Sequence, residues 1–158
     1  MNSLAQLFTS KEVLLDLDVQ DQAALFGAVG QLVQEHHGLT AATVVDGLTA
    51  REQLGSTGLG EGMAIPHARI EGLSDALAAI VRVNAPIAFD APDGKPVGYF
   101  FVLLAPAQAT EQHLHILNDV AQFFADEQFR QQIDMAKSQE EMYRLFSTWT
   151  GSDLRKAA

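Results

Sequence analysis

The sequence predicts an α/β fold made of one domain, with a mixed, mostly central β-sheet flanked by helices. Its apolar residues recur with a period of two in some segments and at spacings of three and four in others, which are the patterns of strands and helices. Extended segments lie between an N-terminal and a C-terminal group of helices, an order typical of a sheet covered by helices. A length of 158 residues, 47% of them hydrophobic, suits a single core, so we expect one domain over residues 1–158.

The N-terminal third predicts one strand and two helices. Valine and leucine alternate with aspartate over residues 13–19, which is the pattern of a half-buried strand. Apolar residues recur at three and four over residues 21–37, and Gly38 supplies a stop, which predicts an amphipathic helix. We expect a second helix to begin at Thr40 as its N-cap and to end at Gly55.

The middle of the chain predicts a glycine-rich loop followed by strands. Four glycines within residues 55–62 indicate a loop without a regular element. Short apolar runs over residues 63–65, 76–83 and 97–104 indicate strands, with a turn at residues 93–94.

The last third of the chain is expected to be helical. Residues 112–125 carry an apolar stripe at helical spacing. Ser138 and Glu141 have the spacing of a capping box, so another helix is expected to begin there.

Composition excludes several classes of function. Ten Lys and Arg against 20 Asp and Glu give a net charge of −10, which disfavours binding to nucleic acid or to an anionic membrane. The most apolar stretch, residues 97–105, is about half as long as a membrane span, and we expect neither membrane insertion nor export. The chain has no cysteine, which removes disulfides, thiolate nucleophiles and cysteine zinc sites and fits a cytoplasmic location.

His67 is the residue most suited to chemistry. It follows Pro66, whose ring fixes its own φ and biases Ile65 towards extended geometry, so His67 is expected at a rigid strand end beside the glycine-rich loop. An ordinary imidazole is mostly neutral near pH 7 and is then a nucleophile that can accept a phosphoryl group. That transfer needs donors around three equatorial oxygens, and Arg51, Thr57 and the loop amides are the candidates.

The other four histidines differ in their expected surroundings. His36 and His37 lie at a helix end, where the dipole favours them, and we assign them no chemistry. His113 and His115 are two residues apart on an expected helix, so they point in opposite directions. The neighbours at helical spacing place His113 inward and His115 towards solvent. His113 is either a core histidine or a second imidazole that converges on His67.

Other chemistries fit the sequence less well. His67, His113 and His115 are metal-ligand types, but a His-x-His pair on a helix does not present both rings to one ion, so no metal or other cofactor is expected. There is no Gly-x-Ser-x-Gly motif of a serine hydrolase. The glycine-rich loop lacks the Gly-Lys-Ser/Thr ending of a nucleotide-binding P-loop.

Four segments, in order, resemble the signatures of a known family. They are residues 51–60 (REQLGSTGLG), 62–67 (GMAIPH), 86–97 (PIAFDAPDGKPV) and 111–117 (EQHLHIL). They resemble the enzyme IIA components of the bacterial phosphoenolpyruvate-dependent phosphotransferase system, in the mannitol/fructose class. Within this class the chain looks most similar to the nitrogen-related regulatory branch, because it carries the FDAPDGKPV stretch.

The resemblance implies a role for each candidate residue. His67 is the phosphoryl acceptor, His113 is a second active-site histidine, and Arg51 and Thr57 border the phosphoryl pocket. The expected donor is a small HPr-like phosphocarrier, without a cofactor. The expected targets are regulatory proteins, for example ion transporters or kinases, that bind according to the phosphorylation state. The chain would then be a cytoplasmic phosphoprotein of signal transduction.

Two other functions remain open from the sequence. The chain can be a sugar-specific enzyme IIA that passes phosphate to a fructose- or mannitol-type permease component. It can also be an interaction module that has kept the fold without phosphoryl transfer, although its intact histidines argue against this.

Overall fold

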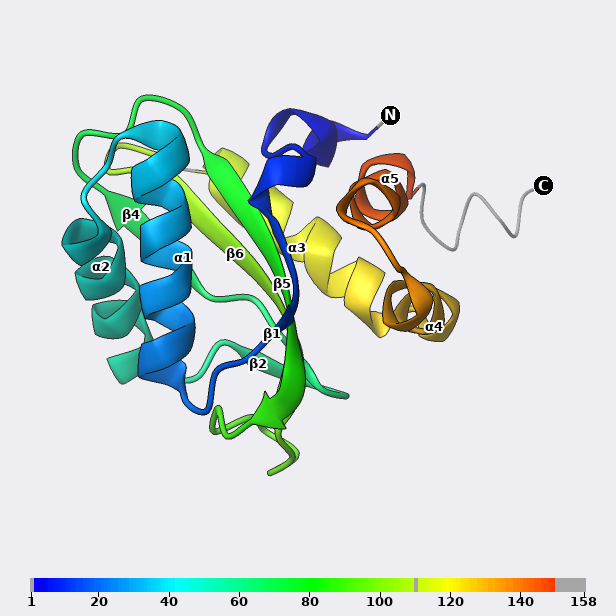
Figure 1. Cartoon of the computed structure of the whole chain (residues 1–158). Coiled ribbons are helices and arrows are strands. Elements are labelled where there is room, and N and C mark those ends of the chain that lie inside the picture. The colour runs from blue at the N-terminus through cyan, green and yellow to red at the C-terminus, as the bar shows by residue number, and fades with distance from the viewer. Residues whose placement is uncertain (1, 110, 150–158) are drawn as a thin grey trace.

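The polypeptide forms three layers, with helices on both faces of a six-stranded sheet, in the computed structural model of Figure 1. The structure describes residues 2–109 and 111–149, apart from the side chains of residues 3 and 111–114. Along the chain, the elements are the 3₁₀ helices η1 (Ser3–Gln6) and η2 (Ser10–Glu12), then β1 (Val13–Leu17), α1 (Gln22–His37), α2 (Ala41–Gln53), β2 (Gly58–Gly60), β3 (Met63–Ala64), β4 (His67–Ile70), β5 (Leu77–Ile87), β6 (Val97–Pro106), α3 (Glu111–Ala125), α4 (Glu127–Met135) and α5 (Gln139–Thr148).

The sheet is mixed, with the strand order β1-β5-β6-β3-β2, and β4 also pairs with β6. The pairs β1–β5, β3–β6 and β4–β6 are parallel, whereas β5–β6 and β2–β3 are antiparallel. The two long strands β5 and β6 therefore form the centre of the sheet, and their apolar runs are buried. The predicted fold class, a mixed α/β fold with a central sheet flanked by helices, is confirmed.

Two apolar clusters lie on opposite faces of the sheet. One joins α1 and α2 to the sheet, and Phe26, Val29 and Leu48 are fully buried in it. The other joins η1, α3, α4 and α5 to the opposite face, with Phe101, Phe123 and Phe146 at its centre. Alternate residues of β6 enter different clusters, because neighbouring strand residues point to opposite faces.

The predicted helix boundaries follow from observed caps. Asp21 accepts a hydrogen bond from Ala24 N at the start of α1, and Gly38 ends that helix with a φ of 76°. Thr40 caps α2 as predicted. Ser138 caps α5, but the Glu141 carboxylate accepts from Lys137 N at 2.8 Å, so the reciprocal bond falls one residue before the expected capping box.

The glycine-rich segment departs from its predicted structure. We expected no regular element over residues 55–62, yet Gly58–Gly60 forms β2 and pairs with β3. Glu61 and Gly62 connect the two strands with φ values of 56° and 79°, which are the positive angles of a two-residue hairpin turn. The Asp93 carboxylate accepts a hydrogen bond from Glu61 N at 3.1 Å and so holds the turn from another loop.

Two other differences concern the lengths and the number of elements. The strand expected over residues 76–83 continues to Ile87 as β5. The helix α4 lies within the region that was expected to be helical. Only two of its apolar residues, Phe129 and Ile133, are buried, so the apolar pattern did not predict where this helix begins and ends.

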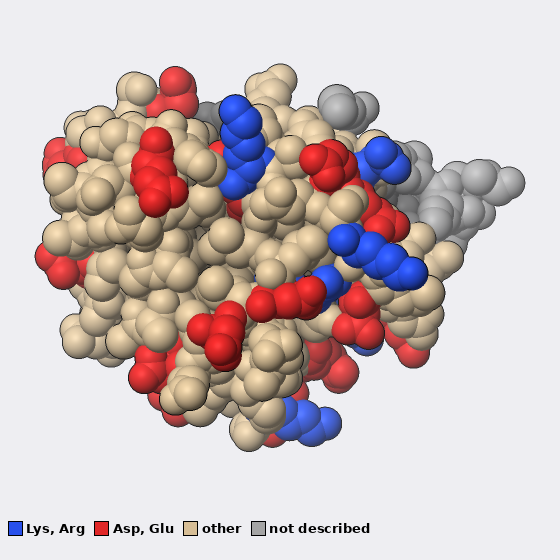
Figure 2. Space-filling view, in the orientation of Figure 1, with Lys and Arg blue, Asp and Glu red and all other residues tan. Residues whose placement is uncertain are grey.

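Charge is distributed unevenly over the surface. In Figure 2, the coloured side chains over α1 and α2 are acidic, whereas Lys and Arg occur together with Asp and Glu over the rest of the view. The sequence explains this, because no Lys or Arg occurs between Glu12 and Ala50. Within the described part of the chain, no helix has the length and apolar character needed to cross a membrane.

Candidate functional site

His67 begins β4, immediately after a break in the sheet. Met63 pairs with Tyr99 and His67 pairs with Leu103, so β3 and β4 continue along β6 in one unchanged register. Pro66 lacks an N–H and interrupts the ladder between them, although its carbonyl still accepts from Leu103 N at 2.9 Å. The expected strand end is thus a strand interruption, with His67 on its far side.

The strand register determines the face on which His67 lies. Residues directly paired in a parallel ladder point to the same face of the sheet. Leu103, the partner of His67, belongs to the apolar cluster between the sheet and α3–α5. The next residue, Ala68, belongs to the cluster between the sheet and helices α1 and α2. The half-buried His67 ring therefore lies on the α3 side of the sheet.

The His67 ring is held by the backbone two residues earlier. Its Nδ1 lies 2.9 Å from the Ile65 carbonyl oxygen. A carbonyl oxygen only accepts, so Nδ1 carries the hydrogen and donates it. In the neutral ring the lone pair is then on Nε2, which makes Nε2 the nucleophilic atom.

Thr57 is buried between the end of α2 and the link from β3 to β4. Its carbonyl oxygen accepts from Ile65 N at 3.1 Å, which joins it to the residue that holds His67. Its own N–H donates to Glu52 Oε2 at 3.1 Å, and its hydroxyl donates to Glu52 Oε1. Thr57 therefore lies beside the His67 segment, with both of its donors directed to one carboxylate.

Glu52 was not predicted as a site residue. It lies in the last turn of α2, half-buried, and burial raises the pKa of its carboxyl above the usual value, against the opposing effects of the Thr57 hydrogen bonds and of Arg51. The sequence shows a carboxylate at a helix end before the glycine-rich loop, but its pairing with Thr57 depends on the path of that loop.

Arg51 lies beside Glu52 at the end of α2. Its Nη1 donates to the Gly55 carbonyl oxygen at 2.8 Å, which fixes the start of the glycine-rich loop. A guanidinium has five N–H donors, so this bond commits one of them. Arg51 thus contacts the glycine-rich loop, and Thr57 contacts Ile65, which holds the His67 ring. Among the described contacts, none joins Arg51 directly to His67.

His113 and His115 both lie on α3. The side chain of His113 lies outside the described residues, and its backbone belongs to the first turn of the helix. That turn precedes Ile116, which is buried in the same cluster as Leu103, the partner of His67 in the sheet. His115 is exposed, as predicted.

His36 and His37 flank the buried carboxylate of Glu12. His36 Nδ1 lies 3.1 Å and His37 Nε2 lies 3.8 Å from Glu12 Oε2. The carboxylate also accepts from Thr9 N at 2.9 Å. These rings are about one-third exposed, and besides their predicted place at the helix end they form a contact between α1 and η2.

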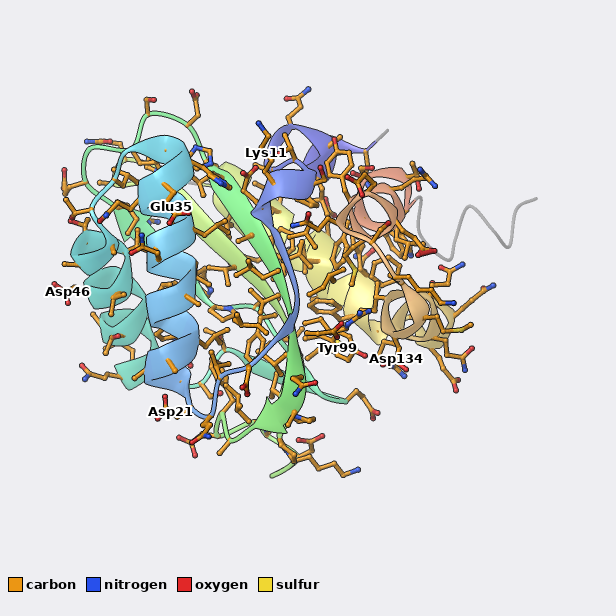
Figure 3. All side chains as sticks on the ribbon, viewed as in Figure 1. Lys11, Asp21, Glu35, Asp46, Tyr99 and Asp134 are labelled. Atoms are coloured by element: carbon orange, nitrogen blue, oxygen red, sulfur yellow. The ribbon has the colours of Figure 1, made fainter. Side chains whose placement is uncertain are left out.

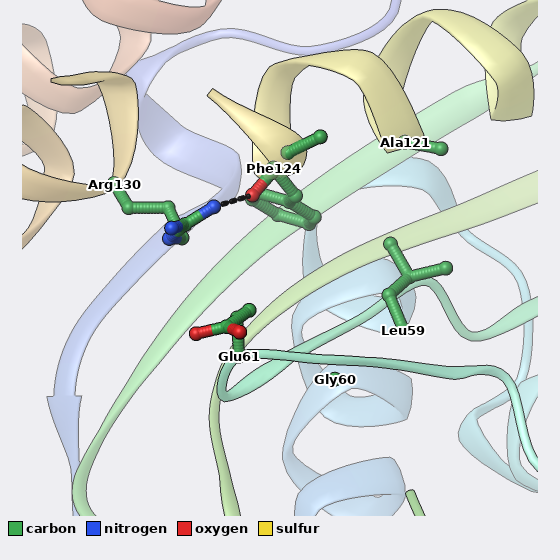
Figure 4. A pocket seen from close by; sticks show the side chains of 7 residues that line it. Leu59, Gly60, Glu61, Ala121, Phe124 and Arg130 are labelled. Atoms are coloured by element: carbon green, nitrogen blue, oxygen red, sulfur yellow. Dashed lines mark hydrogen bonds between the residues drawn. The ribbon is translucent and has the colours of Figure 1, made fainter. Parts of the chain in front are cut away.

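No metal centre forms among the described side chains, in which no cluster of three or more His, Asp or Glu suits an ion. A hollow of about 390 Å³ lies between the β2–β3 hairpin, α3 and α4. In Figure 4, Leu59 and Glu61 face Phe124 and Arg130 across it, and Arg130 Nη1 donates to the Phe124 carbonyl at 2.7 Å. This hollow contains none of the predicted site residues.

The fold and the site together define a mixed α/β protein that presents a backbone-held imidazole at a break in its sheet. The chain belongs to the family described as "Phosphoenolpyruvate-dependent sugar phosphotransferase system, EIIA 2", which it matches over residues 6–149. The predicted resemblance to enzyme IIA components is therefore confirmed.

Similar proteins support the nitrogen-related branch. A "Nitrogen regulatory protein" of Pseudomonas aeruginosa is 36% identical over 146 residues, covering 92% of this chain and 95% of that protein. One of Escherichia coli is 39% identical over 127 residues, covering 78% and 77%. The crystal structure of nitrogen regulatory protein IIA-Ntr from Neisseria meningitidis has a TM-score of 0.87 at 39% identity and covers 91% of this chain and 99% of its own.

More distant structures share the fold alone. The mannitol IIA of Escherichia coli has a TM-score of 0.72 at 14% identity, covering 87% of this chain and 97% of its own. The predicted mannitol-type architecture is thus confirmed at a level of identity where sequence similarity is weak.

Proposed function

We propose that this chain is a nitrogen-related phosphotransferase-system regulator that accepts a phosphoryl group on His67 Nε2 from an HPr-like phosphocarrier. The observation that carries the proposal is the 2.9 Å hydrogen bond from His67 Nδ1 to the Ile65 carbonyl. It selects Nε2 as the nucleophile and holds the ring before a donor arrives. The family resemblance supports a cytoplasmic location, which is part of this proposal.

The transfer exchanges one phosphorus–nitrogen bond for another. The Nε2 lone pair of His67 attacks the phosphorus of the carrier's phosphohistidine, whose other ring nitrogen carries a proton. The phosphorus–nitrogen bond to the carrier breaks with its electron pair returning to the carrier's ring, which leaves as a neutral imidazole. The proton on His67 Nδ1 stays in place. The Ile65 carbonyl oxygen faces this N–H and stabilises the positive charge that the ring gains.

The phosphoryl oxygens need donors, and Arg51, His113 and the Thr57 loop are the proposed source. Arg51 is the strongest candidate, because four of its five N–H groups lie outside its bond to Gly55. Thr57 already donates to Glu52 through both its N–H and its hydroxyl, so we propose that it shapes the pocket rather than supplying the main donor. The proposed role of His113 follows from the family resemblance.

Regulation follows from the change in charge. A phosphoryl group adds about 1.5 to 2 negative charges to the surface around His67. This change in charge determines which proteins can dock there. The similar proteins carry the name nitrogen regulatory protein, which supports targets of a regulatory kind over a sugar.

Mass spectrometry tests the proposal directly. The purified protein is incubated with phosphoenolpyruvate, enzyme I and an HPr-like carrier, and its intact mass is read before and after acid treatment. We expect one acid-labile phosphoryl group, absent from His67→Ala and retained by His115→Ala, which removes an exposed histidine from α3. Full uptake by His67→Ala would overturn the proposal.

The His113→Ala variant tests the second histidine. We expect slower transfer with an unchanged fold, because a donor to the transferred group is lost while the helix remains. Stopped reactions over time give the rate, and circular dichroism checks the fold. Transfer at the wild-type rate would make His113 a structural residue.

A second candidate function is onward transfer to a sugar permease component. A "PTS system fructose-specific EIIA component" of Haloferax volcanii is 36% identical over 96 residues, which is 61% of this chain. Transfer of label from the phosphorylated protein to fructose in reconstituted membranes would favour this function. Label that stays on His67 would favour the regulator.

A further inference from the structure

Glu52 occupies a place that is unfavourable for a carboxylate. It lies in the last turn of α2, where the negative end of the helix dipole repels an anion, and it is half-buried. Glu52 uses both carboxylate oxygens on one residue, Thr57, through an N–H bond of 3.1 Å and a hydroxyl bond. A charge kept in such a place, with all its described hydrogen bonds directed to the site loop, points to a function at that site.

The bonds continue from Thr57 to the nucleophile. The Thr57 carbonyl oxygen accepts from Ile65 N at 3.1 Å, and the Ile65 carbonyl oxygen accepts from His67 Nδ1 at 2.9 Å. Each of these steps uses a different atom of a buried or half-buried residue. The result is a continuous series of hydrogen bonds from the end of α2 to the His67 ring.

Other bonds hold the same loop but do not lead to His67. Arg51 Nη1 donates to the Gly55 carbonyl at 2.8 Å, and Ser56 Oγ donates to the Phe89 carbonyl at 2.8 Å. These fix where the loop begins. Among the described contacts, the Thr57 N–H and hydroxyl both donate to Glu52. The Ile65 peptide is held from the loop side by Thr57 and from the sheet side by the pairing of β3 and β4 with β6.

We propose that Glu52 is a positioning residue for phosphoryl transfer: its carboxylate orients Thr57, Thr57 orients the Ile65 peptide, and the Ile65 carbonyl keeps the proton of His67 on Nδ1. This inference rests on the function proposed above. Without Glu52 the Ile65 carbonyl moves relative to the ring, so the proton distributes between Nδ1 and Nε2, and the Nε2 lone pair is no longer constantly presented to the donor.

The tautomer of His67 is the readout that a merely structural role would not change. Protein labelled with ¹⁵N-histidine gives the two ring-nitrogen shifts of each histidine, and the signals missing from His67→Ala identify His67. In the wild type we expect the shifts of an Nδ1–H ring. In Glu52→Ala we expect the two His67 shifts to move towards each other as the tautomers interchange.

The rate of transfer is the second readout. We expect Glu52→Ala to take up one phosphoryl group in full but roughly 10- to 100-fold more slowly in a single turnover, because a small misplacement of the reacting atom has effects of this size. Glu52→Gln should stay within about threefold of the wild type, because its amide oxygen accepts from Thr57 N–H and its amide nitrogen donates to the Thr57 hydroxyl oxygen.

Asp46→Ala is the matched control. Asp46 is an exposed carboxylate on the same helix, pointing away from the sheet in Figure 3, and its removal should change neither the tautomer nor the rate. If Glu52→Ala does not fold, Thr57→Val serves in its place. It keeps the N–H bond to Glu52 and removes the hydroxyl bond, so we expect an intermediate loss of rate and a partial shift of the tautomer.

The outcomes separate this inference from the function on which it rests. A folded Glu52→Ala variant with the wild-type tautomer and rate would overturn the role of Glu52 while leaving His67 as the acceptor. A wild-type protein that takes up no phosphoryl group would overturn the proposed function. The tautomer comparison, which needs no carrier, then decides by itself whether Glu52 positions the ring.

Discussion

At the scale of single residues, polar side chains that meet across elements determine how the protein responds to pH. Tyr99 of β6 donates its hydroxyl hydrogen to Asp134 of α4, and the pair lies at the junction of sheet and helix in Figure 3. Burial, and then the bond and charge of Asp134, raise the pKa of the Tyr99 phenol well above its usual range. The folded state therefore keeps a proton that the unfolded chain loses near pH 10.

This difference gives Tyr99 a predicted pH dependence. The neutral phenol is favoured in the folded state, so its contribution to stability is complete below pH 10 and declines as the pH rises further. We expect Tyr99→Phe to lower the free energy of unfolding by roughly 0.5–1.5 kcal/mol at pH 7, and by less above pH 10. Urea unfolding across this pH range measures it.

Tyr143→Phe is the control for this prediction, because Tyr143 bonds the Ala5 carbonyl and leaves the Tyr99 pair intact. Absorbance at 295 nm follows phenolate formation in both variants. A Tyr99 phenol that ionises near pH 10 in the folded protein would contradict the predicted effect of Asp134 and burial on its pKa.

The same scale shows what the sequence can and cannot predict about the site. His67 and Thr57 were predicted because Pro66 and the glycines mark an unusual backbone, and the structure joins the two through Ile65. The ring tautomer and the contribution of Glu52 were not predictable, because both depend on how the loop returns to the end of α2.

At the scale of elements, glycines decide how closely helices approach. A methyl group at Gly30 of α1 would lie 2.9 Å from the Ala41 carbonyl oxygen and 3.1 Å from Val45 Cγ2 on α2. A methyl group at Gly27, three residues earlier on the same helix, has no other atom within 4 Å. The first position needs glycine for packing, whereas the second does not.

We therefore expect opposite effects from two identical substitutions. Gly27→Ala should raise the free energy of unfolding by roughly 0.5–1 kcal/mol, through helix propensity. Gly30→Ala should lower it by roughly 1–3 kcal/mol, because the contacting atom is backbone and α2 must move away. Chemical unfolding of the two variants side by side gives the comparison. Equal effects would mean that α1 and α2 lie farther apart at Gly30 than the 2.9 Å approach to the Ala41 carbonyl oxygen implies.

The position of α4 depends on Arg82 of β5. This side chain is only 12% exposed, and its Nη1 donates to the carbonyls of Ile133 at 2.9 Å and Ala136 at 2.7 Å, which are orphan acceptors at the end of the helix. Its Nε donates to Asp16 at 3.2 Å. One guanidinium therefore joins β1, β5 and α4.

Removing this guanidinium should loosen α4 before the rest of the fold. We expect Arg82→Met to lower the free energy of unfolding by about 2 kcal/mol and to speed hydrogen exchange of the α4 amides more than those of β5 and β6. Arg69→Met, which changes an exposed strand arginine, is the control and should have little effect. Uniform acceleration across the sheet would contradict a local role.

The sequence predicted the capped helices but not the β2–β3 hairpin, and the difference has a physical reason. The caps at Thr40 and Ser138 and the stop at Gly38 act within one turn of helix, so sequence signals located the starts of α2 and α5 and the end of α1. The β2–β3 hairpin was missed because Glu61 has a positive φ that is supported by Asp93, a residue distant in sequence. Local patterns do not contain such support.

At the scale of the whole molecule, the sheet order determines where the charges lie. The order β1-β5-β6-β3-β2 places β1 at the edge beside β5, and both α1 and α2 cover one face. Amphipathic stripes predicted that these helices are packed on a sheet, but not which face they cover. The segment from Glu12 to Ala50 has six carboxylates and no Lys or Arg. Three of them, Asp21, Glu35 and Asp46, lie at the start of α1 or on α1 and α2, before Arg51 at the end of α2.

This uneven charge predicts a dependence of stability on salt. With a net charge of −10, the negative side chains repel one another more in the folded state than in the expanded chain. Added salt shortens the distance over which this repulsion acts. We expect the unfolding temperature to rise between about 10 mM and about 200 mM NaCl. Asp46→Lys, on the outer surface of α2, should make this rise smaller, and Lys11→Glu should make it larger. Equal slopes in all three proteins would mean that salt acts through general solvation and that repulsion among the carboxylates does not destabilise the fold.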